Sequence, residues 1–349
     1  MLLEFFGFEG DARVLHVVLG GLLGLIFGVA AQISRFCIRR AVAGEGRDGA
    51  QAGAVWITAL AVAIAAFIGA SVFGLVDLAE HRFWSLELPV VAILIGGLMF
   101  GSGMILTRGC ISRLTVLSAT GNLRAALVLV VFAIVAHATL KGVLAPARVA
   151  LGSITVDLPF GTLLDHSVLA YGLCALAVAV SVALIRVTRP APLHMAMAVV
   201  IGLLPVVGWA GTSVLLLDEF DPQPVQSIAF TLPFTDSLFW IIASSAIPAT
   251  FGVGLVGGVL AGSFVSAAAR GELALQSFDT GSQTVRYLSG AALMGVGGVL
   301  AGGCTVGAGL AGAASLSIAA LLALVAIVVG GIATNFLMSH QSASALPAE

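Results

Sequence analysis

The sequence predicts an all-α polytopic membrane protein, and three observations carry this prediction. Of the 349 residues, 60% are hydrophobic and only 9% are charged, whereas a soluble domain carries roughly 25% charged residues. Apolar runs long enough to cross a bilayer recur along the chain, and one glycine-rich segment ending in cysteine occurs twice. The formal net charge of −2 and the lack of a basic patch argue against nucleic acid as a partner.

Nine segments satisfy the length of about 20 mostly apolar residues that a membrane helix requires. We expect them near 14–33, 53–75, 88–106, 122–144, 166–187, 193–217, 238–268, 284–300 and 316–338. The seventh is long enough to contain a short extra helix before Pro248. The N-terminus carries Glu4, Glu9 and Asp11, whereas a secretory signal begins with basic residues, so we expect the first span to be retained.

Basic residues are retained on the cytoplasmic side of a membrane, so their distribution predicts orientation. Of the 15 Lys and Arg residues, the N-terminus and the loops after even-numbered spans hold only four, which are Arg13, Arg82, Lys141 and Arg148. The other 11 lie in the loops after odd-numbered spans. The loop near 218–237 is purely acidic, with Asp218, Glu219, Asp221 and Asp236. We therefore expect a bacterial inner-membrane protein with its N-terminus outside and its C-terminus in the cytoplasm.

An internal repeat divides the single membrane domain, residues 1–349, into two halves. GGLMFGSGMILTRGC (96–110) matches GAALMGVGGVLAGGC (290–304) at a constant offset of 194, with four glycines, a leucine and Cys110/Cys304 coinciding. A weaker pair, 20–28 and 252–262, aligns three more glycines and places Gly271 over Cys37. We expect half one at about 14–145, half two at about 238–338 and connecting spans at 166–217. The topology puts the two copies on opposite faces, as in inverted repeats.

Glycine is concentrated around Cys304, where Gly302, Gly303 and Gly307 flank Cys304 and Thr305. Such a sequence forms a poor helix, and irregular backbone at membrane depth is tolerated where it is buried in protein or lines a cavity. A helix that restarts there exposes amide N–H groups that attract anions. Spaced glycines elsewhere, as at 20–28, fit close helix packing.

The four cysteines have different predicted roles. Cys110 and Cys304, duplicated in register after Gly109 and Gly303, are expected to line a path, and Cys37 lies among Arg35, Arg39 and Arg40, whose charge favours an anionic guest. Cys174 lies in a plain apolar run and is expected only to pack. With no close cysteine pair, the chain shows neither a disulfide framework nor a zinc site.

The chain carries few residues of the kinds that couple transport to protons or that hold a cofactor. No predicted span carries Asp or Glu at its centre, and Lys141 is near a helix end, where it would snorkel. His137 is a candidate path residue, but a lone His in a membrane helix is more often held by a helix–helix hydrogen bond. No phosphate loop, metal-ligand cluster or nucleophile–base pair is present, so we predict no enzyme activity, no cofactor, no metal and no ATP-driven transport within this chain.

These residues resemble the YeeE/YedE family of sulfur-transport membrane proteins over nearly the whole chain. SGAALMGVGGVLAGGCTVGAGLAG (289–312) is similar to that family's signature, the segment ending at Cys110 is its first-half copy, and Arg35-Phe36-Cys37 resembles its aromatic-Cys motif. The resemblance implies an hourglass of nine spans with short half-helices entering from both faces, three thiols at the constriction, and a small cytoplasmic TusA-like sulfur carrier as partner. Arg108 and Arg113 around Cys110, and Ile38-Arg39-Arg40 after Cys37, depart from the family pattern.

We therefore predict uptake of thiosulfate or a closely related sulfur anion along a path through Cys37, Cys110 and Cys304. The predicted supporting residues are Gly109, Gly303, Thr305, Gly307, Arg35, Arg39, Arg108 and Arg113. Three alternatives stay open, namely transport of another sulfur or selenium species, a membrane thiol-redox enzyme, and a structural scaffold. Whether the thiols act covalently, by a transient persulfide, or through S–H contacts also stays open.

Overall fold

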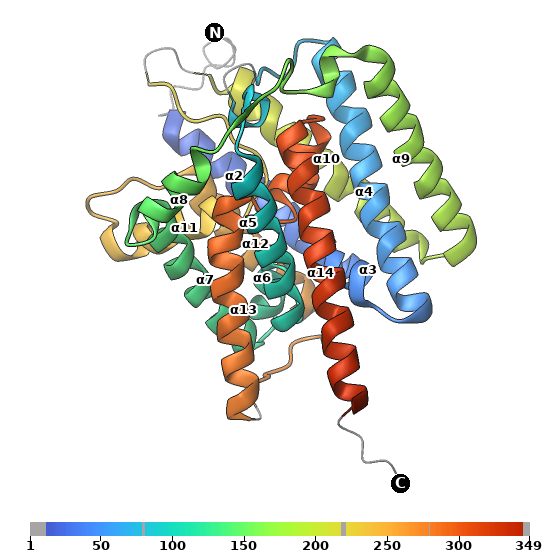
Figure 1. The fold of residues 1–349 in the computed structure, drawn as a ribbon, viewed down its shortest axis with the longest axis vertical. Coiled ribbons are helices and arrows are strands. Elements are labelled where there is room, and N and C mark those ends of the chain that lie inside the picture. Colours follow the sequence, from blue (N-terminus) through green and yellow to red (C-terminus); the bar gives the residue numbers. More distant parts are fainter. Residues whose placement is uncertain (1–11, 79–80, 218–220, 279, 345–349) are drawn as a thin grey trace.

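The computed structural model describes residues 12–78, 81–217, 221–278 and 280–344, and most of these residues are helical (Figure 1). Five acidic residues used in the predictions above lie outside the described residues. They are Glu4, Glu9 and Asp11, from the prediction that the first span is retained, and Asp218 and Glu219, from the orientation prediction. The long helices are α2 (Ala12–Ser34), α4 (Gly46–Val72), α5 (Val90–Leu106), α7 (Leu123–Lys141), α9 (Ser167–Thr188), α10 (Pro192–Ala210), α12 (Phe251–Ala269), α13 (Gly281–Leu300) and α14 (Ile318–Ser344).

Shorter elements connect the long helices. They are α3 (Ile38–Ala43), α6 (Ile111–Ala119), α8 (Ala145–Gly152), α11 (Thr231–Ala243), the 3-10 turns η1 (Arg82–Trp84) and η2 (Leu163–Asp165), and the π-turns η3 (Gly211–Leu215) and η4 (Gly307–Gly312). The described strands are β1 (Glu87–Leu88) and β2 (Val156–Asp157), which pair antiparallel. Strand therefore contributes one small ribbon to a helical protein.

The all-α membrane class is confirmed. Eight helical segments of the described chain are long and apolar enough to cross a membrane, and they match eight of the nine predicted spans. The remaining prediction, 284–300, corresponds to α13, whose polar first turns and glycines lower its hydropathy. The predicted span 238–268 is two helices, α11 and α12, separated before Phe251, because Pro248 interrupts the apolar run.

Helices α2 and α12 form the closest helix pair, and glycine makes the approach possible. A Cβ on Gly24 would lie against the Leu255 carbonyl, and one on Gly258 against the Gly21 carbonyl. The Ser263 hydroxyl donates to the Gly28 carbonyl at 3.3 Å. Contacts advance along both helices together, so the two run in the same direction, with backbones in contact through small residues.

Helices α5 and α13, which carry the repeated segment, pack antiparallel. Gly96 lies against Gly297, and Gly103 lies against Gly290. At the offset of 194, exchanging the two copies turns the first contact into the second, so the pair is reciprocal. A second face of α5 packs through Gly97 and Gly101 onto α14. The two cysteine segments therefore leave this pair at its opposite ends.

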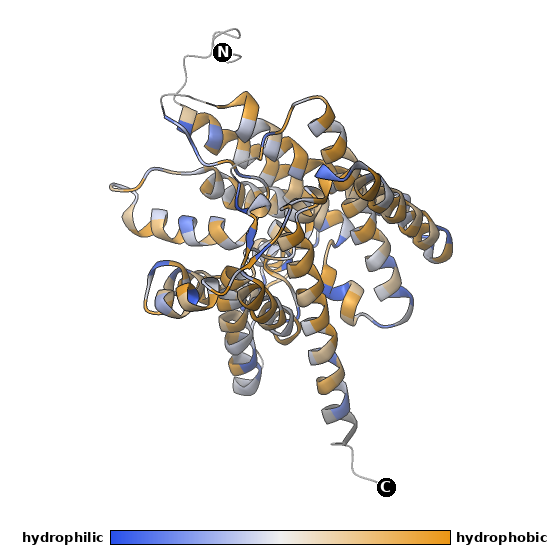
Figure 2. Cartoon of the chain, turned by 45° about the horizontal axis from the view of Figure 1, so that its top comes forward, coloured by the Kyte–Doolittle hydropathy of each residue, from blue (hydrophilic) through white to orange (hydrophobic). Residues whose placement is uncertain are grey.

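The helix exteriors are apolar along most of their length, with hydrophilic residues gathered at ends and connections (Figure 2). Helix α9 packs beside α4 at the periphery (Figure 1) and buries few of its own residues. An apolar helix with one protein-facing side is what a bilayer accommodates. The first turn of α2 and the last turn of α14 lie at opposite ends of the molecule (Figure 1), so the described helices begin and end on different faces.

Candidate functional site

The three cysteines of the predicted path share one backbone arrangement. Arg35, Arg108 and Gly302 each lie two residues before a cysteine and have positive φ values of 52°, 59° and 76°. Cys37 is the N-cap residue of α3 and Cys110 is the N-cap residue of α6, while the Cys304 carbonyl accepts hydrogen bonds from the Ala308 and Gly309 amides. A left-handed residue ends each preceding helix, so each thiol stands where a helix stops and a new helical turn begins.

The same backbone pattern identifies the residue of the second half that corresponds to Cys37. Gly271 follows α12 and has φ of 65°, as Arg35 does after α2. By backbone conformation the residue equivalent to Cys37 is therefore Leu273, two positions beyond the Gly271 that the sequence alignment places there. Two extra residues between Gly262 and the end of α12 cause the shift. The second half lacks this cysteine by either alignment.

The structure brings the three thiols together. Cys37, Cys110 and Cys304 are 3%, 2% and 0% exposed. The Cys37 and Cys110 side chains are neighbours that interact directly, Thr305 interacts with Cys110, and Cys304 lies within electrostatic range of Cys110. The segments after α5 and α13 therefore turn back from opposite ends of that pair to meet.

Hydrogen-bond donors surround these sulfurs. The Gly307 amide donates to Cys304 Sγ at 3.3 Å, and Cys110 Sγ lies 3.3 Å from Ser112 Oγ. The arrangement offers weak, polarisable sulfur contacts beside backbone amides at helix starts, which suits a soft anion. Cys174 lies apart on α9, half-buried, as the packing prediction requires.

One cavity of about 470 Å³ opens at one face, and its wall includes Arg113, three residues beyond Cys110. Its wall contains Arg35, Arg40 and Arg113 together with Asp48 and Glu272, and the remaining lining residues are Gln32, Leu117, Thr120, Asn122, Ala274 and Gln276. They come from the loops that the distribution of basic residues assigns to the cytoplasm. We call it the inner cavity.

A second cavity, of about 720 Å³, lies beside Cys304 and includes Gly303 and Gly307 in its wall. Asp48 of the inner cavity is in the first turn of α4, whereas Asp77 of this second cavity follows the end of α4. The 27 residues of α4 span about 40 Å at 1.5 Å each, so the cavities lie at opposite faces with the thiols between them. We call the second the outer cavity.

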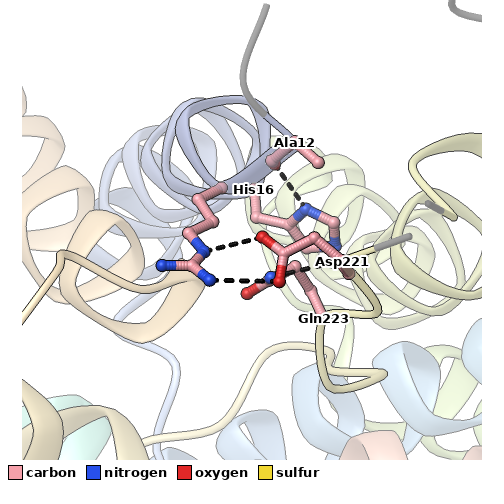
Figure 3. Close-up of polar contacts among 5 residues, drawn as sticks. Ala12, His16, Asp221 and Gln223 are labelled. Carbon is pink, nitrogen blue, oxygen red and sulfur yellow. Dashed lines mark hydrogen bonds and ion pairs between the residues drawn. The ribbon is translucent and has the colours of Figure 1, made fainter. Parts of the chain in front are cut away.

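The wall of the outer cavity includes most of the segment from Pro222 to Pro233. An Arg13–Asp221 ion pair, with Nε–Oδ2 at 2.8 Å and Nη2–Oδ1 at 3.0 Å, joins the start of this segment to α2 (Figure 3). This pairing holds the Asp221 carboxyl pKa below its usual range. Gln223 donates to the Asp221 carbonyl at 3.2 Å, and the adjacent His16 ring bonds the Ala12 carbonyl at 2.8 Å (Figure 3).

Sequence reasoning missed two polar residues of the outer cavity, His81 and Arg82. Arg82 Nη2 donates to the Gly302 carbonyl at 2.8 Å, so it fixes the turn that precedes Cys304. The His81 ring packs against Phe83 and Trp209, each with centroids 4.9 Å apart. Arg82 is one of only four basic residues in the predicted outer regions, and that rarity was the available signal.

Burial lowers the pKa of His81 to about 4. Because an unfolded chain binds this proton with a pKa near 6.5, acidification below that value favours the unfolded state until the folded pKa is reached. We expect the melting temperature in detergent to fall between pH 7 and pH 5, and His81→Gln to flatten that dependence. Equal slopes for both proteins over this interval would contradict the assignment to His81.

The predicted supporting residues divide by cavity. Gly303 and Gly307 line the outer cavity, and Arg35 and Arg113 line the inner one, while Thr305 contacts Cys110. Three others lie outside both cavity walls: Gly109 packs near Leu114, Arg108 serves as the left-handed residue, and Arg39 sits in α3. Gln32 and Glu272 of the inner wall, which are hydrogen-bonded at 2.9 Å, were not predicted, because their approach depends on α2 and α12 ending together.

Comparison with known proteins identifies the family of this chain. The profile of the Sulphur transport family matches residues 34–333, which include all three cysteines of the predicted path. The thiosulfate transporter TsuA of Escherichia coli (strain K12) is 32% identical over 133 residues, which are 38% of this chain and 36% of that protein. The match thus spans about a third of that relative's length. The family match covers most of the chain and confirms the YeeE/YedE resemblance, so this multi-pass membrane protein belongs to the Sulphur transport family.

Proposed function

We propose that this protein carries thiosulfate, or a closely related sulfur anion, into the cytoplasm through a path lined by Cys37, Cys110 and Cys304. The observation that carries the proposal is the meeting of three buried thiols between two cavities at opposite faces. The family match supports sulfur transport, and the partial likeness to a thiosulfate transporter supports the substrate.

The chemistry of the constriction suits an ion with one soft and one hard end. Thiols are weak donors whose polarisable sulfur suits the terminal sulfur of thiosulfate, whereas backbone amides at helix starts suit its oxygens. Each contact is weak, and conduction needs sites that release as readily as they bind. Residues Gly303, Gly307 and Thr305 place amides and a hydroxyl beside the thiols.

Direction and location follow from charge. The inner cavity carries three arginines in its wall, and basic loops are retained in the cytoplasm. We therefore propose that the inner cavity opens to the cytoplasm of a bacterial cell and that α2 begins outside the inner membrane. A small TusA-like sulfur carrier would receive the anion at the inner face.

The test is uptake of ³⁵S-thiosulfate by bacterial cells that lack their own thiosulfate transporters, with and without this chain. We expect chain-dependent uptake that excess unlabelled thiosulfate abolishes and that equal sulfate reduces far less, since sulfate has no terminal sulfur for the thiols. Absence of uptake at confirmed membrane levels would overturn the thiosulfate assignment, and selenium and other sulfur anions would be tested next.

A further inference from the structure

The inner cavity holds more positive charge than its own carboxylates neutralise. Arg40 is paired with Asp48, and its Nη1 donates to the Arg35 carbonyl at 3.1 Å. Glu272 accepts from Arg270 at 3.0 Å and from Gln32 at 2.9 Å. Both carboxylates in the wall are therefore engaged by other groups.

Among the described residues, these pairings leave two arginines of the wall, Arg35 and Arg113, without a carboxylate partner. Arg35 is exposed, whereas Arg113 is largely buried. The Nη1 atom of Arg113 is buried and has no hydrogen-bond partner within the described part of the chain. The guanidinium lies within electrostatic range of Cys37 and Cys110 and of two other cations, Arg35 and Arg40.

A buried guanidinium N–H without an acceptor is costly, since it has lost water and gained nothing in exchange. The planar guanidinium presents paired N–H donors that match the oxygens of an oxyanion. An anion that enters the cavity from the thiols would supply the missing acceptor. Arg35 adds long-range attraction from the cavity wall.

We propose that the inner cavity contains a binding site for a sulfur oxyanion, with the Arg113 guanidinium donating to the anion's oxygens. The inference rests on the proposed function for the identity of the physiological anion. It adds that thiosulfate is held with its oxygens toward Arg113 and its terminal sulfur toward Cys37 and Cys110. Sulfite and sulfate, which present the same oxygens, also occupy this site and compete from the inner face.

The test uses the purified full chain in detergent, with thiosulfate, sulfite and sulfate as separate probes in titration calorimetry. We expect Arg113→Gln to weaken binding of all three at least tenfold and Arg113→Lys to weaken it less. Arg47→Gln is the matched control, because Arg47 is an exposed arginine of the same face outside the cavity wall, and its affinities should stay within twofold of wild type. Melting temperatures confirm that each variant is folded.

Unchanged sulfite and sulfate binding in folded Arg113→Gln would overturn the site. The proposed function fails separately, because it is measured as uptake by cells. Arg113-dependent binding without thiosulfate uptake would retain the site and reject the transported substrate. Thiosulfate uptake together with Arg113-independent binding would retain the function and reject the site.

Sidedness provides a second readout. In inside-out membrane vesicles, sulfate added to the bath reaches the inner cavity directly and should inhibit thiosulfate flux in wild type but not in Arg113→Gln. The same sulfate added to right-side-out vesicles should inhibit less. Equal inhibition from both sides would contradict a site at the inner face.

Discussion

Leucine in place of Gly258 is expected to prevent this protein from accumulating in folded form. A Cβ at this position would lie against the Gly21 carbonyl oxygen and 2.8 Å from the Leu25 amide nitrogen. Both obstacles are backbone atoms, so no side-chain rotation relieves the clash and α2 and α12 must separate. Because overpacking at a rigid contact costs about 1–3 kcal/mol and occasionally more, a loss of about 3 kcal/mol or more is expected.

The adjacent glycine provides the matched control for this experiment. A Cβ on Gly257 meets nothing within 4 Å, so Gly257→Leu adds the same side chain to the same helix without a clash. Folded yield in size-exclusion chromatography and the melting temperature report the difference. Comparable yield and melting temperature for the two variants would show that the α2–α12 contact is not as rigid as the structure indicates.

Alanine in place of Cys304 is expected to reduce thiosulfate uptake by more than about tenfold, a change equivalent to about 1.4 kcal/mol. Cys304 is fully buried beside the Gly307 amide, next to the wall of the outer cavity. Removing the sulfur leaves the backbone donors in place but takes away the polarisable contact for the terminal sulfur of the anion. Initial uptake rates at matched membrane levels measure the effect.

Cys174→Ala is the control for loss of a thiol, because Cys174 lies on α9 away from both cavities, and its uptake should equal that of wild type. Serine variants of Cys37, Cys110 and Cys304 keep a donor and lose the sulfur. Wild-type rates in all three serine variants would exclude both the covalent and the S–H version of the path.

The sequence was sufficient for the helices and for the helix breaks at the cysteine segments. Hydropathy located the spans because a bilayer demands long apolar runs, and the glycine clusters located the breaks near Cys110 and Cys304. The break inside the predicted span 238–268 was less visible, because α11 and α12 are both apolar and only Pro248 separates their patterns.

The walls of the two cavities were harder to predict, because they depend on how distant segments meet. His81 and Arg82 adjoin Cys304 through the packing of η1 on the segment after α13, and nothing local to His81 or Arg82 indicates this. Arg39 and Arg113 look alike in sequence, each near a cysteine, yet only Arg113 lines the inner cavity. The difference arises from their positions around the helix. Arg39 is two residues beyond Cys37 in α3, whereas Arg113 is three residues beyond Cys110 in α6, so the two side chains leave their helices in different directions.

The placement of the thiols between two opposed cavities has an electrical consequence. Water in each cavity brings the potential of the adjoining solution close to the constriction, so most of the transmembrane voltage falls across the three cysteines. A dianion moved inward against 100 mV, inside negative, must overcome about 4.6 kcal/mol, at about 2.3 kcal/mol per charge. Without a coupled ion, net entry then requires a free concentration inside roughly 10³-fold below that outside. Rapid chemical consumption of the anion at the inner face would maintain that gradient.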